Sequence, residues 1–171
     1  MTQLAANADN LRIGLMGVGG VCAAVHYPGL SRIPGVTIQA ICDPNAELVS
    51  SRAAEWGVSS SFTNVGDLLA EGLDAVVIAT PNDQHRPLIE AALDAGGHVL
   101  CEKPLGMSLR ETIAIYEKAE ASGLRHMTAF TYRFVPAMNY LRHLVHTGVL
   151  GEIRHARVQR LQDWGEDAIG W

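Results

Sequence analysis

Two short segments of this 171-residue chain combine residue types that could bind a nucleotide and act on a hydroxyl group. One is the glycine-rich run Gly17-Val18-Gly19-Gly20-Val21-Cys22, whose backbone N–H groups could bind a pyrophosphate. The other is Cys101-Glu102-Lys103-Pro104, in which the Lys103 ammonium could orient a substrate hydroxyl and relay its proton. A solvated lysine in a turn is the alternative interpretation of Lys103, so the surrounding elements must decide.

The glycine run stands in the context that dinucleotide binding requires. It follows the apolar run 11–16 and opens a predicted helix, and the next apolar run ends at Asp43. An acid there accepts hydrogen bonds from the adenosine ribose hydroxyls and repels a 2′-phosphate, which favours NAD over NADP. Cys22 replaces the usual third glycine but is still small. A plain glycine-rich turn is the alternative to a cofactor site formed by Gly17, Gly19, Gly20, Val21 and Asp43.

A second polar loop, Thr80-Pro81-Asn82-Asp83-Gln84-His85, follows the apolar run 75–79. Asn82 or Asp83 could cap the next helix while Pro81 fixes the entry of the chain. Ligands of doubly wound sheets bind outside the carboxyl ends of the strands, so a capping role is compatible with cofactor contact.

Short apolar runs alternate with longer helical patterns along most of the chain. This alternation predicts an α/β fold in which a parallel, doubly wound sheet of the Rossmann type is built by right-handed crossovers. A capping box of Ser108 and Glu111 is predicted to open one helix. The predicted strands cover 11–16, 36–42, 60–63 (at an edge), 75–79, 98–101 and 126–130, and the predicted helices cover 20–31, 45–56, 83–95, 108–122 and 136–147.

The two ends of the chain differ from this pattern. Residues 1–10 have no basic and no apolar signal-peptide region and are predicted to be a mobile leader. After Gly151 a half-polar strand is predicted over 153–162, whereas 163–171 show no periodicity.

Composition argues against several classes of partner. The 13 basic and 18 acidic residues give a net charge of −5, which disfavours a dedicated nucleic-acid binder. No apolar run approaches the ~20 residues that span a bilayer. The three cysteines form no metal or disulfide spacing, and His143 with His146 is better explained as an exposed helix face than as a metal site. We therefore expect a cytoplasmic protein without a metal, membrane or nucleic-acid partner.

Several motifs, taken in order, resemble those of the glucose–fructose oxidoreductase/inositol dehydrogenase (Gfo/Idh/MocA) family. The Glu-Lys-Pro element is the specific one, because many families share the glycine loop. The similarity extends from Leu11 to about Asp163. The motifs are Gly17–Cys22, Thr80-Pro81-Asn82 with His85, Ala95–Cys101, Glu102-Lys103-Pro104, Tyr132-Arg133-Phe134 with Pro136, and Gly148–Ile153.

The resemblance implies a Rossmann domain over 11–148 that binds NAD or, less favoured, NADP, and the truncated start of a C-terminal α+β domain for substrate and oligomer contacts over 149–171. It implies hydride exchange with a sugar, inositol or related polyol, and a homo-oligomer. Lys103 would contact the reacting hydroxyl as the catalytic residue. The implied cofactor contacts are Thr80, Pro81, Asn82, His85, Glu102 and Lys103, and the implied substrate-pocket residues are Tyr132 and Arg133.

The sequence departs from this family by ending early. Members usually continue for roughly another 150–200 residues, the size of a second domain. No Asp-x-x-x-His arrangement follows in the present sequence. The chain is therefore predicted to be inactive or incomplete by itself. A non-catalytic dinucleotide-binding module or sensor is the alternative, and a protein-interaction domain on the same scaffold is a third possibility.

Overall fold

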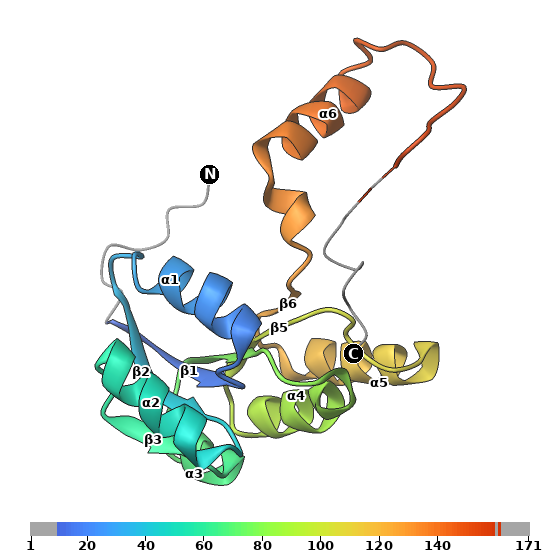
Figure 1. The fold of residues 1–171 in the computed structure, drawn as a ribbon. Coiled ribbons are helices and arrows are strands. Elements are labelled where there is room, and N and C mark those ends of the chain that lie inside the picture. The colour runs from blue at the N-terminus through green and yellow to red at the C-terminus, as the bar shows by residue number, and fades with distance from the viewer. Residues whose placement is uncertain (1–9, 160, 162–171) are drawn as a thin grey trace. The chain divides into compact units, whose positions relative to one another are not determined.

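A parallel β-sheet of six strands forms the centre of the first part of the chain (Figure 1). The computed structural model describes residues 10–159 and 161. These fall into a first unit that ends at Phe130 and a second unit that begins at Thr131. The strand order β3-β2-β1-β4-β5-β6 confirms the predicted Rossmann topology. The strands are β1 (Leu11–Met16), β2 (Val36–Cys42), β3 (Ser60–Phe62), β4 (Ala75–Ile78), β5 (His98–Cys101) and β6 (His126–Thr128).

Helical segments connect successive strands of the first unit. Side chains cap several of them; Asn45, for example, accepts a hydrogen bond from Leu48 N at 3.0 Å. The segments are the π-helix η1 (Cys22–His26), α1 (Tyr27–Leu30), α2 (Ala46–Trp56), α3 (Val65–Leu69), the 3₁₀ turn η2 (Asn82–Gln84), α4 (His85–Asp94) and α5 (Leu109–Ser122).

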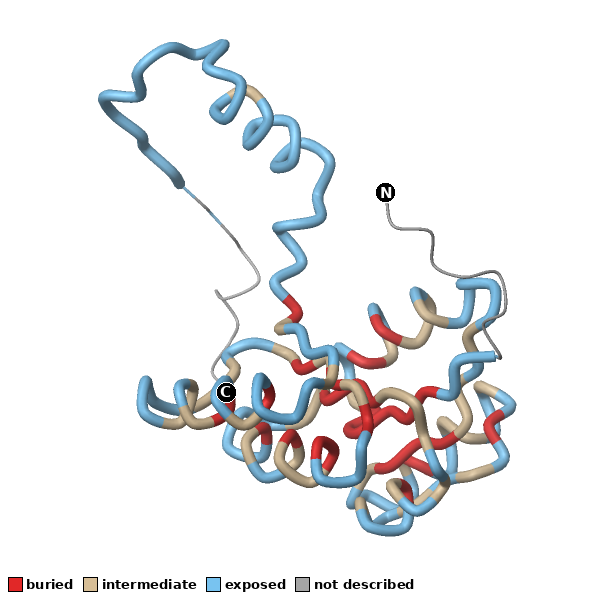
Figure 2. Tube along the Cα trace, turned by 180° about the vertical axis from the view of Figure 1, so that it is seen from behind, coloured by how far each residue is buried: buried red, intermediate tan, exposed pale blue. Residues whose placement is uncertain are grey.

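Strand residues alternate between two cores, one on each face of the sheet. Ile13 and Leu15 of β1 belong to the core covered by η1, α1 and α2, whereas Met16 belongs to the core covered by α3, α4 and α5. Figure 2 shows the buried positions gathered in the strands and in the helices that cover them. Burial on both faces is the reason why the strands read as continuous apolar runs in the sequence.

The first connection differs from the single helix predicted over 20–31. The chain makes a π-helical turn in η1, where Tyr27 N donates to Cys22 O, before it enters α1. Pro28 follows directly and has no N–H with which to continue an ordinary α-helical ladder. The turn therefore widens by one residue at this point.

One helix was missing from the prediction. α3 has five residues, too few to show helical periodicity. The feature of the sequence that indicates this helix is its N-cap residue Asn64, whose Oδ1 accepts a hydrogen bond from Gly66 N at 2.7 Å. β4 and β6 also end before the predicted 79 and 130, a difference at strand ends only.

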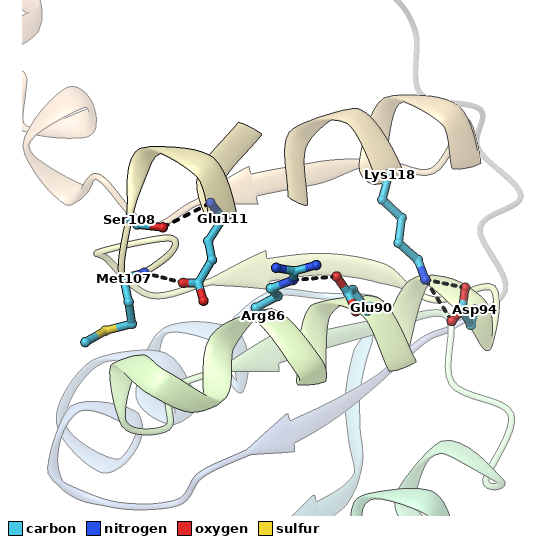
Figure 3. Close-up of polar contacts among 7 residues, drawn as sticks. All are labelled: Arg86, Glu90, Asp94, Met107, Ser108, Glu111 and Lys118. Carbon is cyan, nitrogen blue, oxygen red and sulfur yellow. Dashed lines mark hydrogen bonds and ion pairs between the residues drawn. The ribbon is translucent and has the colours of Figure 1, made fainter. Parts of the chain in front are cut away.

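The start of α5 corrects the predicted capping box. Ser108 Oγ accepts from Glu111 N at 3.2 Å, as predicted, but the Glu111 carboxylate accepts from Met107 N at 2.8 Å (Figure 3). Gly106 allows this close approach, since a Cβ there would lie 3.1 Å from Glu111 Cβ. Figure 3 also shows Lys118 of α5 reaching Asp94 at the end of α4, with a separation of 2.8 Å.

The second unit contains the 3₁₀ turn η3 (Thr131–Phe134) and α6 (Pro136–His146). The strand predicted over 153–162 is wrong for residues 153–159 and 161, which form no strand. A strand is stabilised by a ladder with a neighbour, and the described sheet ends with β6. Residues 160 and 162, the tail 163–171 and positions 1–9 of the predicted leader lie outside the described residues.

Candidate functional site

A pocket of about 630 Å³ opens at the carboxyl ends of β1, β2 and β4. This is the place where open parallel sheets bind ligands, and the volume falls in the range of small-molecule sites. The lining residues come from the glycine loop, the ends of β2 and β3, and the segment after β4. They are Met16, Gly17, Gly19, Gly20, Val21, Cys42, Asp43, Pro44, Thr63, Val65, Ala79, Thr80, Pro81, Gln84 and Leu88.

The pocket brings together most, but not all, of the predicted cofactor residues. Those in its lining are Gly17, Gly19, Gly20, Val21, Asp43, Thr80 and Pro81, and those outside it are Asn82, His85, Glu102 and Lys103. Sequence reasoning missed Thr63, Val65, Gln84 and Leu88 as lining residues. Gln84 belongs to the polar loop 80–85, whereas Thr63 and Val65 follow the edge strand β3, whose sequence carries no motif of a binding site.

A glycine is required at position 17, because the glycine loop passes close to the backbone directly after the end of β4. Its φ is +81°, and a Cβ at this position would lie 2.7 Å from the backbone oxygen of Ala79. Gly17 N also donates to Cys42 O at 2.8 Å, so the loop is held against the end of β2. The missing side chain therefore lets three strand ends approach one another and leaves loop backbone facing the pocket.

Asp43 holds the same loop through its carboxylate. Oδ2 accepts from Val18 N at 3.1 Å and Oδ1 accepts from Asn45 N at 3.0 Å. The side chain thus joins the glycine loop to the turn that begins α2, and it lines the pocket as well. A carboxylate fixed in this way can accept further hydrogen bonds from a diol, since each oxygen has two lone pairs.

Thr80 provides an independent sign of a ligand. Its hydroxyl oxygen is buried and has no hydrogen-bond partner among the described residues, although buried polar atoms are normally paired. Thr80 also lines the pocket, so this unpaired hydroxyl belongs to a residue that borders the space a ligand would fill. With the glycine loop and Asp43, this donor and acceptor set fits a dinucleotide.

His85 is not among the residues that line the pocket. Its side chain is fully buried, with Nδ1 2.7 Å from Pro104 O and Nε2 3.0 Å from Thr80 O. Both ring nitrogens already face carbonyl groups of the protein. We therefore interpret His85 as a support between two loops, with no free polar atom for a cofactor.

Lys103 is exposed, and its peptide bond to Pro104 is cis. The preceding Glu102 is largely buried and directs one carboxylate oxygen to His26 Nε2 at 2.9 Å and the other to Lys103 N at 3.1 Å. Among the described contacts, the Lys103 ammonium makes no ion pair. It is thus available to a substrate, while its backbone is fixed by Glu102.

Asn82, Tyr132 and Arg133 lie outside the nucleotide pocket. Asn82 begins η2 and is exposed. Tyr132 and Arg133 lie on η3 in the second unit, where with Met138, Asn139 and Arg142 they line a hollow of about 250 Å³. Their part in cofactor or substrate binding stays a prediction.

The cysteines are free and buried in the first unit. Burial raises the pKa of Cys22 and of Cys101 to about 12 and that of Cys42 to about 11. Thiols with such pKa values are poor nucleophiles and metal ligands at neutral pH. No cluster of three or more His, Cys, Asp or Glu suited to a metal occurs in residues 10–159 and 161.

The same described residues contain no helix with the length and apolar composition needed to cross a bilayer. The sheet order and the pocket at its switch point define a dinucleotide-binding Rossmann domain. Residues 11–130 match the family described as "Oxidoreductase family, NAD-binding Rossmann fold" (GFO_IDH_MocA), and the chain belongs to that family. This confirms the resemblance inferred from the sequence.

Relatives and solved structures agree with this family. The chain is 32% identical to levoglucosan dehydrogenase of Pseudarthrobacter phenanthrenivorans, over 93% of this chain and 43% of the relative. It is 35% identical to inositol 2-dehydrogenase of Corynebacterium glutamicum, over 85% of this chain and 44% of the relative. The chain thus spans less than half the length of these two relatives.

Among solved structures, scyllo-inositol dehydrogenase from Lactobacillus casei with NAD(H) and scyllo-inositol has a TM-score of 0.79 at 27% identity, covering 84% of this chain and 43% of its own. A 3-ketoreductase from Actinomadura kijaniata in complex with NADP has a TM-score of 0.76 at 28% identity, covering 84% and 44%. Similar structures thus carry either cofactor, and the choice between NAD and NADP rests on the residues of this chain.

Proposed function

We propose that the chain is the dinucleotide-binding part of an oxidoreductase that transfers a hydride between a nicotinamide and a carbinol carbon of a sugar, inositol or related polyol. The observation that carries this proposal is the pocket, in which a crowded Gly17, a fixed Asp43 and an unpaired Thr80 hydroxyl meet at the switch point of the sheet. The relatives named for levoglucosan and inositol support the substrate class.

The residues divide the work of binding and proton transfer. Backbone N–H groups of the glycine loop bind the pyrophosphate, and Asp43 accepts hydrogen bonds from the adenosine ribose. The negative charge of Asp43 repels a 2′-phosphate, which favours NAD over NADP. Thr80 offers its hydroxyl nearer the middle of the sheet, and Asn82 and Glu102 lie toward the nicotinamide ribose. The dinucleotide, when bound, supplies the carbon that gives or accepts the hydride.

Lys103 is the proposed catalytic residue. When the carbinol is oxidised, the neutral amine of Lys103 accepts the hydroxyl proton as the hydride leaves the carbon, and in the reverse reaction the exposed ammonium returns that proton to the carbonyl oxygen. Tyr132 and Arg133 are proposed to contact the substrate hydroxyls. The backbone of Lys103 is held by Glu102, so the ammonium works from a fixed base.

A non-catalytic dinucleotide-binding module is the second candidate. It requires only the pocket and the fixed Asp43 carboxylate of the first unit, and it needs no part of Lys103. The two candidates share the same pocket and differ only in turnover.

Titration of the chain with NADH and NADPH, followed by nucleotide fluorescence, tests the proposal. We expect the chain to bind NADH more tightly than NADPH. Asp43→Asn should lower the affinity for NADH by about tenfold and reduce the difference between the affinities for NADH and NADPH. Glu117→Gln removes the same charge from an exposed position on α5 and serves as the control.

Reduction of NAD is then measured over a panel of polyols and sugars. Turnover supports the oxidoreductase for this chain, whereas binding without turnover supports the non-catalytic module. A chain that binds neither nucleotide contradicts both candidates.

A further inference from the structure

His26 is a buried polar residue to which the proposed function assigns no role. It is the last residue of η1, and 7% of its side chain is exposed. Neither its spacing nor its neighbours in the chain distinguish it from the other six histidines. Its surroundings in the fold, however, point to the segment that carries Lys103.

The Glu102 carboxylate connects His26 to Lys103. Oε1 lies 2.9 Å from His26 Nε2, and Oε2 accepts from Lys103 N at 3.1 Å. An ionised carboxylate only accepts hydrogen bonds, so His26 Nε2 carries the hydrogen. With its side chain 12% exposed, Glu102 needs both donors to remain where it is.

The contact joins two parts of the proposed site that are far apart in sequence. His26 lies at the end of the segment that follows the glycine loop, and Glu102 lies directly after β5. The π-helical form of η1 adds to this picture, because such turns occur frequently at functional sites in proteins.

We propose that His26 is a positioning residue, which holds Glu102 so that Glu102 in turn fixes the backbone from which Lys103 reaches the substrate. His26 belongs to the helical segment that follows the glycine loop, and it is not among the residues that line the nucleotide pocket. The inference rests on the proposed function in one respect, namely that Lys103 is the group to be positioned.

The proposal is tested by hydrogen exchange of backbone amides, measured by NMR on the whole chain without nucleotide. In His26→Leu, Glu102 loses one donor, and we expect the Lys103 amide to exchange about tenfold faster relative to the Val77 amide in the central strand β4. His26→Gln, which restores an N–H at a similar distance, should return the ratio to its original value. Glu102→Gln has one accepting oxygen for two donors and should resemble His26→Leu.

A second histidine–glutamate pair provides the matched control. His126 Nε2 lies 2.8 Å from Glu120 Oε1, but the side chains are 31% and 55% exposed, and His126 lies at the start of β6. His126→Leu should leave the Lys103 ratio unchanged. An unchanged ratio in His26→Leu, or equal acceleration at Lys103 and Val77, overturns the proposal.

The proposed function fails separately, if the wild-type chain does not bind NADH. Exchange at Lys103 needs no nucleotide, so the two results are independent. If the exchange ratio of the Lys103 and Val77 amides changes in His26→Leu but the wild-type chain binds no NADH, the contact between His26 and Glu102 still positions Lys103. In that case the proposed catalytic role of Lys103 is wrong.

Discussion

Apolar side chains occur in both units of the chain, but among residues 10–159 and 161 only those of the first unit are fully buried. Leu15, Ile41 and Ile78 of the sheet are 0% exposed, whereas Leu141 of α6 is 48% exposed. Figure 2 shows the same contrast, with almost all described positions from Thr131 onward exposed. In the first unit, helices cover both faces of the central strands β1, β2 and β4. α6 is an amphipathic helix without a comparable layer inside its own unit.

The comparison teaches that an apolar pattern predicts an element but not its burial. In the first unit the pattern and its partners are both present, so the fold is stable by its own contacts. In the described residues of the second unit the apolar pattern is present, but the side chains are mostly exposed and gain little of the free energy that burial supplies. Paired substitutions, one in each unit, test this difference.

The largest effect is expected from matched leucine truncations. Leu15→Ala opens a cavity in a fully buried position and should lower the free energy of unfolding by about 3 kcal/mol. Leu141→Ala should change it by less than ~0.5 kcal/mol, because this side chain is half exposed. Urea unfolding followed by circular dichroism measures both. Equal losses would show that the apolar face of α6 is covered in solution.

Matched glycine substitutions should have the next largest effect. Gly17 and Gly148 have φ values of +81° and +73°, but a Cβ on Gly17 meets the Ala79 backbone while one on Gly148 meets nothing within 4 Å. Gly17→Ala should cost about 2 kcal/mol of stability and abolish NADH binding. Gly148→Ala should leave the urea concentration at the midpoint of unfolding of the first unit unchanged. The same urea series is the measurement, and a Gly17→Ala protein as stable as wild type would contradict the close approach.

Cysteine reactivity reports on the first unit alone, since all three cysteines lie there. Because burial raises the pKa of Cys22 and of Cys101 to about 12, only about one thiol in 10⁴ is ionised at pH 8. We expect a disulfide reagent to label the native chain very slowly and to label three thiols after unfolding. Cys42, with a pKa of about 11 and a place in the pocket lining, should react first and be protected by NADH. Rapid labelling of the native chain would contradict the buried core.

The smallest effect concerns two ion pairs. Hydrogen bonds from Arg12 lower the pKa of the Asp74 carboxyl below its ordinary 3.8. The unfolded state then binds the proton more readily, so the pair stabilises the fold above pH 3.8 and loses this contribution as the pH falls through the lowered value. In Asp74→Asn the free energy of unfolding should therefore fall less steeply as the pH is lowered. The effect should be small, because both side chains of the pair are more than a third exposed.

Glu152→Gln is the matched variant in the second unit, where Glu152 and Arg154 are 3.6 Å apart and more than four-fifths exposed. This substitution should leave the dependence of the unfolding temperature on pH unchanged. The range from about pH 2 to about pH 7 covers the titration of carboxyl groups. An effect equal to that of Asp74→Asn would mean that the second unit is ordered by contacts of its own.

Most of the fold could be predicted from local patterns. β1, β2 and β5 cover the predicted 11–16, 36–42 and 98–101, because strands buried on both faces read as apolar runs. α3 is too short to be predicted from periodicity. The strand over 153–162 was predicted from apolar residues spaced among polar ones, although no partner strand is described for 153–159 and 161. Local pattern is thus sufficient only where a neighbouring element completes it.

The sequence by itself determined most of the succession of strands and helices along the chain, the glycine loop at Gly17 and the acid at Asp43, since each depends on residues close together in the chain. Only the tertiary structure decided the roles of His85 and His26. His85 meets Pro104, and His26 meets Glu102 across 76 positions of sequence. The physical reason is that a histidine acts through the groups that burial places around its two nitrogens, and those groups are chosen by the fold.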